Sequence, residues 1–258
     1  MEVHHHPSVE RKRLKEYLLE FIMIFLAVTL GFFAETIRES ITEHKKAKEY
    51  AESMLRDLQL DTAQLRIYRL YYNYSADNID TLQQLLAHAD PKDIPPGKLY
   101  WYGLFGGAHR NFVPNDETFQ QMKSSGSLRF FGKTVASDAA KYDRFCRVLQ
   151  SAEQMQQEVY GEVRKLRAQI FEFRYNDIAN TISQRRFRNW NYSDYDDIDS
   201  LTKAKLPLLS YDKTLFNQYV EMVRSRFIRT YNVGYADSLL RQASVLIGEL
   251  EDNYHLKE

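Results

Sequence analysis

The feature that most constrains this chain is an apolar stretch near its N-terminus, which runs from Leu14 to Arg38 and reads LKEYLLEFIMIFLAVTLGFFAETIR. No charged residue occurs between Phe21 and Ala34, and the apolar residues just before them are interrupted only by Glu20. The apolar span is about 18 residues long, and about 17 to 25 helical residues are needed to cross a bilayer. We therefore predict a transmembrane helix over residues 17–36, after a short polar, histidine-containing tail over residues 1–16.

Neither a cleavable signal peptide nor a helix of a soluble core fits this stretch as well. A cleavable signal peptide is followed by small residues at its cleavage site, whereas Glu35, Thr36 and Arg38 follow here and continue the helical pattern. A helix buried in a soluble core is the other alternative, but a run that is apolar on all sides is typical of a helix in lipid. We favour an uncleaved signal anchor.

The basic residues predict the orientation of this helix. Those that crowd the N-terminal side are Arg11, Lys12, Arg13 and Lys15. On the other side Arg38 is close, but the lysines lie further along the chain. Because positive residues concentrate on the cytoplasmic side, we expect a single-pass protein of the bacterial inner membrane, with a cytoplasmic N-terminus and a periplasmic C-terminal domain. The inverted topology is the alternative.

Three residues in the span are candidates for contacts with other helices. A carboxylate such as Glu20 is costly there unless it reaches the interface, pairs, or faces the interior of a bundle. Glu20 either marks the inner interface, where Arg13 and Lys15 can satisfy it, or lies at a helix seam or pore of an oligomer. Ala27 and Gly31, four residues apart, offer a face of small residues for close helix packing.

The N-terminal tail contains three consecutive histidines, His4, His5 and His6. They fit the remnant of an affinity tag, a disordered tail or a metal-binding cluster. Three neighbouring side chains of one chain cannot easily all face one ion. The metal site is therefore conditional on a symmetric oligomer that gathers histidines from several subunits.

Composition excludes several classes of function. The 258 residues include 35 basic and 35 acidic side chains, so there is no general electrostatic attraction for nucleic acid. The single cysteine, Cys146, excludes internal disulfides and cysteine-rich metal sites. Glycine and proline number only 10 and 6 and gather in a few places, which predicts long helices with few interruptions.

Hydrophobic periodicity predicts an all-α extramembrane domain over residues 37–258. Apolar residues recur near helical spacing over about 37–89, 115–131, 133–184 and 211–254. The first of these segments contains no proline or glycine, so the transmembrane helix should continue into it. Three long helices with short connections favour an elongated antiparallel bundle of three to four helices. We expect the second long helix to return to the membrane and the third to run away from it again.

An aromatic patch lies between the first two predicted helices of this domain. Its large side chains include Tyr100, Trp101, Tyr102 and Phe105. The glycines among them do not form a phosphate loop, because no Gly-Lys-Ser/Thr follows and no strand precedes. We expect this patch to be an exposed tip of the bundle and to bind a partner.

The polar loop after the second long helix is a second candidate contact surface. Its basic and aromatic residues include Arg185, Arg186, Phe187, Arg188 and Trp190. If the second helix returns to the membrane, this loop lies near the headgroups. Basic residues beside interfacial aromatic residues are typical of a membrane-surface contact. An ordinary solvated loop is the alternative.

Two stretches of the chain resemble a group of known sequences. The run from Asn115 to Leu149, NDETFQQMKSSGSLRFFGKTVASDAAKYDRFCRVL, resembles a segment of uncharacterised single-span membrane proteins of Bacteroidota. The residues that match its Thr-Phe-x-x-hydrophobic-x-x-Ser-Gly-x-Leu pattern are Thr118, Phe119, Met122, Ser125, Gly126 and Leu128. The opening EVHHHP and the anchor are also similar to the start of such proteins. The resemblance implies native histidines and an envelope location, and it implies no chemistry.

No catalytic or cofactor motif is recognisable in the chain. There is no HExxH pattern, no GxSxG elbow and no Glu-x-x-His pattern of di-iron bundles. We therefore expect a protein that is not an enzyme and has no cofactor. It should be a membrane-anchored helical scaffold or sensor-like module that acts through self-association or another envelope protein, with membrane lipid as a further partner. The alternative is a homo-oligomeric channel with Glu20 at the helix seam.

Overall fold

The structure is a computed structural model that describes residues 14–188 and 193–256. Every regular element in these two ranges is helical, which confirms the predicted all-α class. The elements, in chain order, are α1 (Leu14–His88), α2 (Pro96–Leu104), η1 (Phe105–Gly107), α3 (Glu117–Ser125), η2 (Ser127–Phe130), α4 (Lys133–Ile170), α5 (Phe173–Arg188), α6 (Tyr195–Lys203), α7 (Lys213–Arg224), η3 (Arg229–Gly234) and α8 (Tyr235–Tyr254).

The chain divides into two units, Met1–Tyr50 and Ala51–Glu258. In its described part, the first unit is the N-terminal portion of α1. An 18-residue window of this helix has a mean hydropathy of 2.2, and none of that window is buried. Within the apolar stretch, the Thr29 hydroxyl donates to the Phe25 carbonyl at 2.7 Å. By length and composition the helix is able to cross a membrane, a property that signal sequences share.

The helix α1 is uninterrupted from Leu14 to His88, as predicted for residues 17–36 and 37–89. It ends where the sequence turns to Asp90-Pro91, because proline lacks the N–H that a helix interior requires. The next helix, α2, begins with Pro96 in its first turn, a position where the missing N–H costs nothing.

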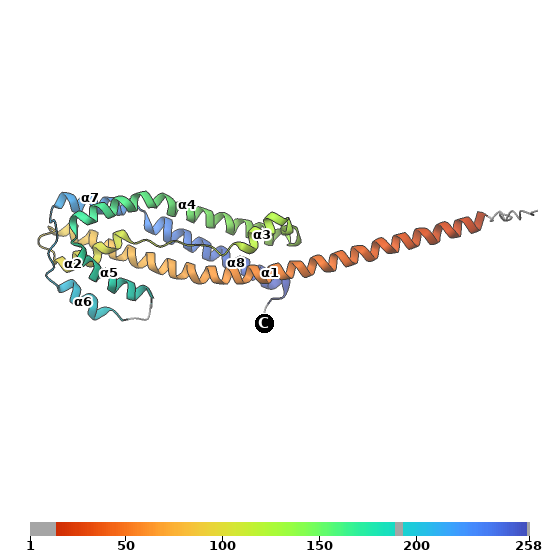
Figure 1. Cartoon of the computed structure of the whole chain (residues 1–258), viewed down its shortest axis with the longest axis horizontal. Coiled ribbons are helices and arrows are strands. Elements are labelled where there is room, and N and C mark those ends of the chain that lie inside the picture. The colour runs from red at the N-terminus through yellow and green to blue at the C-terminus, as the bar shows by residue number, and fades with distance from the viewer. Residues whose placement is uncertain (1–13, 189–192, 257–258) are drawn as a thin grey trace, which may run out of the picture. The chain divides into compact units, whose positions relative to one another are not determined.

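The second unit is a bundle in which α1, α4 and the pair α7–α8 lie side by side (Figure 1). The hydroxyl of Tyr142 on α4 donates to Asp61 on α1 at 2.8 Å, and further along both helices Glu153 is hydrogen-bonded to Tyr68. Because both numbers increase together, α1 and α4 run parallel. The prediction that the second long helix runs back along the first was wrong.

The chain returns instead through an extended segment, residues 108–116, that has no helix of its own. Backbone groups of this segment are hydrogen-bonded to side chains of α1 and α4. As the segment proceeds, its partners on α1 come in reverse order. The Tyr72 hydroxyl donates to the Arg110 carbonyl at 2.9 Å, and the Asn115 backbone N–H donates to Asp61 at 2.8 Å. These buried polar side chains replace the backbone partners that a helix supplies internally, so a return path without regular structure is stable.

The helix predicted over 133–184 is broken into α4 and α5 by tertiary packing. Phe171 is extended, with φ −106° and ψ 129°, and its buried ring lies against Gly103 of α2, where an added Cβ would meet it at 2.5 Å. The predicted helix 115–131 is likewise divided into α3 and η2 at Gly126, which adopts φ 72°. Glycine adopts that left-handed conformation without the penalty of a Cβ.

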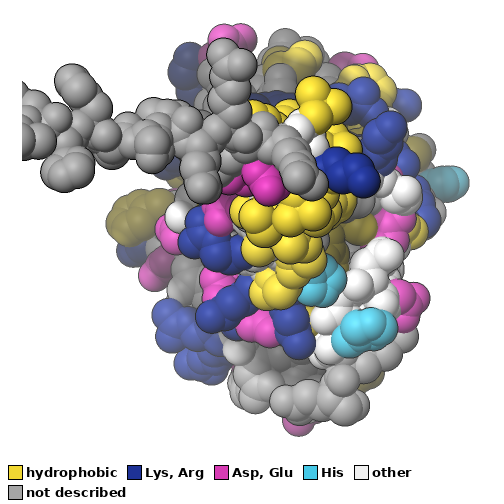
Figure 2. Space-filling view, turned by 90° about the vertical axis from the view of Figure 1, so that its right-hand side faces the viewer, with side chains coloured by type: hydrophobic (Ala, Val, Ile, Leu, Met, Phe, Trp, Pro, Cys, Tyr) yellow, Lys and Arg dark blue, Asp and Glu magenta, His cyan; other side chains and the backbone are white. Residues whose placement is uncertain are grey.

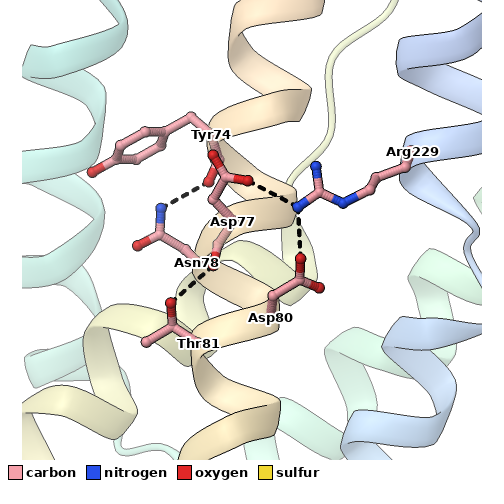
Figure 3. Close-up of polar contacts among 6 residues, drawn as sticks. All are labelled: Tyr74, Asp77, Asn78, Asp80, Thr81 and Arg229. Carbon is pink, nitrogen blue, oxygen red and sulfur yellow. Dashed lines mark hydrogen bonds and ion pairs between the residues drawn. The ribbon is translucent and has the colours of Figure 1, made fainter.

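The helix predicted over 211–254 is also broken, at residues 225–227, where Phe227 adopts φ 48°. The π-helical turn η3 follows this break and continues directly into α8. The turn places Asn232 in the core, where its side-chain N–H donates to the Tyr68 hydroxyl at 2.7 Å. At the surface of the same turn, Arg229 donates to Asp77 at 2.8 Å and to Asp80 at 2.6 Å, both on α1 (Figure 3). Polar contacts on both faces therefore join this turn to α1.

Charges of both signs are mixed on the face shown in Figure 2. On the face shown in Figure 2, hydrophobic side chains gather in one patch, while basic and acidic side chains are interspersed around it. On this face, therefore, neither basic nor acidic side chains form a region of their own.

Candidate functional site

The aromatic patch predicted to be a partner surface lies inside the bundle. Tyr100, Trp101 and Phe105 are 0%, 1% and 2% exposed, and Tyr102 is half-buried. The Tyr100 hydroxyl donates to the Pro207 carbonyl at 2.7 Å, and α2 packs against α5 and α6. The predicted exposed tip was wrong, because later segments of the chain cover these rings.

Several residues of the predicted membrane-surface loop contact other parts of the bundle. Arg186 donates to Asp194 at 2.5 Å and lies over the Tyr74 ring, and the Phe187 ring lies 4.5 Å from that of Tyr71. Arg185 is 3.8 Å from Asp197, Arg188 ends α5, and Trp190 lies outside the described residues. We expected lipid headgroups near this loop because the second long helix was predicted to run back along the first. Since α4 runs parallel to α1, that reason no longer applies.

Of the residues predicted in or before the membrane span, the structure describes three. Glu20, Ala27 and Gly31 lie in α1, and a Cβ added to Gly31 would meet nothing within 4 Å. Close packing of another helix against Ala27 and Gly31 therefore stays a prediction. His4 to His6 lie outside the described residues, and no group of three or more metal-ligating side chains occurs among the residues described.

A polar cluster around Asp61 is structural. Asp61 accepts hydrogen bonds from Asn115 and from the Tyr142 hydroxyl, all at 2.8 Å. The adjacent cavity of about 30 Å³ has room for little more than water. Burial raises the pKa of the neighbouring Cys146 thiol to about 12, so a reactive thiolate is absent there at neutral pH.

A further functional candidate is an open cleft of about 880 Å³, whose walls come from α1, the segment around η1, α4 and α5. Pockets that bind small molecules commonly enclose about 300 to 1,000 Å³, so its size is suitable. Its charged lining residues, apart from a histidine, are Arg110, Arg164, Arg167, Arg188 and Asp177. The lining therefore contains four arginines and one aspartate. Rings and amides complete the lining, including Tyr71, Tyr160, Phe173, Phe187, Asn176 and Asn180.

Arg167 is the most constrained of these arginines. Its guanidinium donates to the side-chain oxygen of Asn176, and its Nε is buried without a hydrogen-bond partner. It passes so close to Gly107 that a Cβ there would lie 2.9 Å from Nη1. Burial lowers the pKa of Arg167 from its ordinary value, yet a guanidinium remains charged in proteins.

A further arginine, Arg226, supports the wall of the cleft from within. It is 1% exposed, and it donates to the carbonyls of Gly106 at 2.6 Å and Ala108 at 2.5 Å. Its guanidinium also lies 5.8 Å from the centre of the Tyr160 ring. Among the described residues no carboxylate pairs with it, so its charge is compensated only by dipoles. A buried cation without a paired carboxylate makes the potential nearby positive.

His109 also lines this cleft, close to Arg226. Its ring lies 5.1 Å from that of Tyr160, and its Nε2 is 3.0 Å from the side-chain nitrogen of Gln157. Burial, together with the charge of Arg226, lowers the pKa of His109. The imidazole is therefore neutral at pH 7 and leaves the arginines as the cations of the cleft.

Only one pattern in the sequence points to this cleft. Arg164 and Arg167 are three residues apart and so share one face of α4. Arg110 and Arg188, however, lie far away in the chain and reach the cleft only through the return segment and the break before α5. In comparisons with known proteins, no family model, no curated protein and no solved structure matches this chain.

Proposed function

We propose that this protein is a non-catalytic, membrane-anchored helical module that acts through self-association or an envelope partner. In this proposal the apolar part of α1 lies in the bacterial inner membrane, with the N-terminus in the cytoplasm and the helical bundle in the periplasm. The proposal rests on one observation. The unbroken helix α1 contains an apolar window with no buried residue and, from Ala51 onward, core residues of the bundle.

The sequence of α1 supports this interpretation. No proline occurs in the helix, and Gly31 is its only glycine, so no flexible linker of the glycine- or proline-rich type separates the apolar stretch from the bundle. The resemblance to single-span proteins of Bacteroidota supports the same location. Large apolar side chains left uncovered over a whole window are typical of a segment that meets lipid or another protein.

Membrane extraction tests the anchor. Leu26 and Leu30 are exposed apolar residues within the window. Replacing both with aspartate costs about 5 to 7 kcal/mol of insertion free energy, at about 2.5 to 3.5 kcal/mol for each charge near the centre of a span. We expect the wild-type chain to stay in membranes washed with alkaline carbonate, and the Leu26→Asp, Leu30→Asp variant to be released.

The matched control places the same charges on the same helix outside the window. Leu60 and Leu70 are also exposed leucines of α1, and the Leu60→Asp, Leu70→Asp variant should remain in the membrane. Release of the wild-type chain by carbonate would contradict the anchor, as would equal retention of the wild type and the Leu26→Asp, Leu30→Asp variant.

A further inference from the structure

We propose that the cleft between η1, α4 and α5 binds a small anionic ligand that carries a phosphate or carboxylate group on a ring-bearing body. This inference goes beyond the proposed function and does not depend on the membrane anchor. It rests on three features of the described residues, namely the charge of the lining, the position of its arginines and the composition of its walls.

The charge of the cleft is not neutralised from within. Among the residues described, no ion pair joins Arg110, Arg164 or Arg167 to a carboxylate, and Asp177 is the one acidic lining residue. Arginines elsewhere in the bundle do pair, as Arg186 does with Asp194 and as Arg229 does with two aspartates. Several guanidinium groups without anions around one hollow form a site for an external anion.

One of these arginines, Arg167, is also held in place before any ligand arrives, and two others lie over aromatic rings. Asn176 and the close backbone at Gly107 fix the Arg167 guanidinium, while the guanidinium groups of Arg110 and Arg164 lie over the rings of Tyr71 and Tyr160 at 6.0 and 5.7 Å. The planar fork of a guanidinium matches the geometry of phosphate and carboxylate oxygens. Side chains that are already ordered lose less conformational entropy on binding.

The walls indicate what else the ligand carries. Phe173 is an exposed aromatic side chain at the cleft, and Tyr71, Tyr160 and Phe187 contribute further rings. Amides from Asn180 and Gln184 lie beside them. Aromatic walls with a few polar groups favour a planar or ring-bearing body rather than a bare inorganic ion. A volume of about 880 Å³ also exceeds what a single phosphate fills.

Isothermal titration calorimetry of the full chain in a neutral detergent tests this proposal with three probes. Phenyl phosphate carries both features, inorganic phosphate carries the charge alone, and phenol carries the ring alone. We expect one phenyl phosphate per chain, weaker binding of inorganic phosphate and the weakest binding of phenol. Affinity for phenyl phosphate should fall as salt is raised, since solvent-accessible charges are screened.

Arginine variants locate the site. Arg164→Gln and Arg110→Gln should each weaken phenyl phosphate binding about tenfold or more, because a charge-assisted hydrogen bond contributes about 1.5 to 3 kcal/mol. Arg144→Gln is the matched control, since Arg144 is exposed on the same helix, lies 5.9 Å from the Phe145 ring and is outside the cleft. It should bind as the wild type does.

The source of the anionic group is tested in a second arm. Phosphatidylglycerol is added to the detergent micelles, with phosphatidylcholine as the neutral comparison. Competition with phenyl phosphate by phosphatidylglycerol alone identifies a lipid headgroup, and its absence identifies a soluble ligand. The proposal is overturned if phenyl phosphate does not bind at millimolar concentration, or if Arg144→Gln weakens binding as much as Arg164→Gln does.

Discussion

Replacing Glu153 with glutamine is expected to make the stability of the helical bundle less dependent on pH. Glu153 lies in α4 and is 7% exposed. It accepts a hydrogen bond from the Phe112 backbone N–H at 3.1 Å and is also hydrogen-bonded to Tyr68. Burial raises the pKa of this carboxyl group to about 7, although both hydrogen bonds favour the charged form.

The direction of the pH effect follows from the two protonation states. The ordinary pKa of the group is 4.5, so the folded bundle holds the proton more tightly than the unfolded chain. Its stabilising contribution is complete below pH 4.5 and is lost as the pH rises through 7. A pKa difference of about 2.5, between 4.5 and about 7, corresponds to about 3 kcal/mol.

Chemical denaturation followed by far-ultraviolet circular dichroism measures this effect for the wild type and for Glu153→Gln. Glutamine keeps the shape and the acceptor for the Phe112 N–H but does not titrate. The unfolding free energy of Glu153→Gln minus that of the wild type should increase by about 3 kcal/mol between pH 4.5 and 8.5. Glu158→Gln, at an exposed position of the same helix, should follow the wild type. A Glu153→Gln difference that stays constant over this range would refute the reasoning.

Two further predictions concern packing and surface charge. Gly103→Ala places a Cβ 2.5 Å from a buried phenylalanine ring and should lower the unfolding free energy by about 1 to 3 kcal/mol, as measured by denaturation. Gly248→Ala, at a position in α8 with nothing within 4 Å, is the control and should be neutral or stabilising by up to about 1 kcal/mol. Arg229→Gln removes two exposed ion pairs and should cost about 0.4 to 2 kcal/mol, less at high salt; a cost independent of salt would contradict the assignment.

Local patterns in the sequence were sufficient to predict the all-α class and the extent of α1. Helical periodicity, the absence of proline from Leu14 to His88 and the prolines that follow are all short-range signals, and the structure agrees with them. Such signals act within a few residues, so one sequence is enough to interpret them.

The path of the chain and the cleft could not be predicted because they depend on distant contacts. The end of α4 is set by a phenylalanine ring that fits against Gly103, and the return segment is fixed by side chains such as Asp61 and Tyr72 of α1. Trp101 and Phe105, four residues apart on one side of their segment, were a signal of a buried helix face that was interpreted as an exposed tip. The parallel course of α4 follows from that return segment, and the cleft arginines meet only because of it.

The most direct test of the proposed function is the mass of the complex released from its own membrane in a mild neutral detergent, measured by native mass spectrometry. We expect a defined oligomer of this chain, or one chain with a bound envelope protein. Wild-type protein that is found only as a bare monomer, without any partner, would contradict the proposal that the module acts through self-association or a partner.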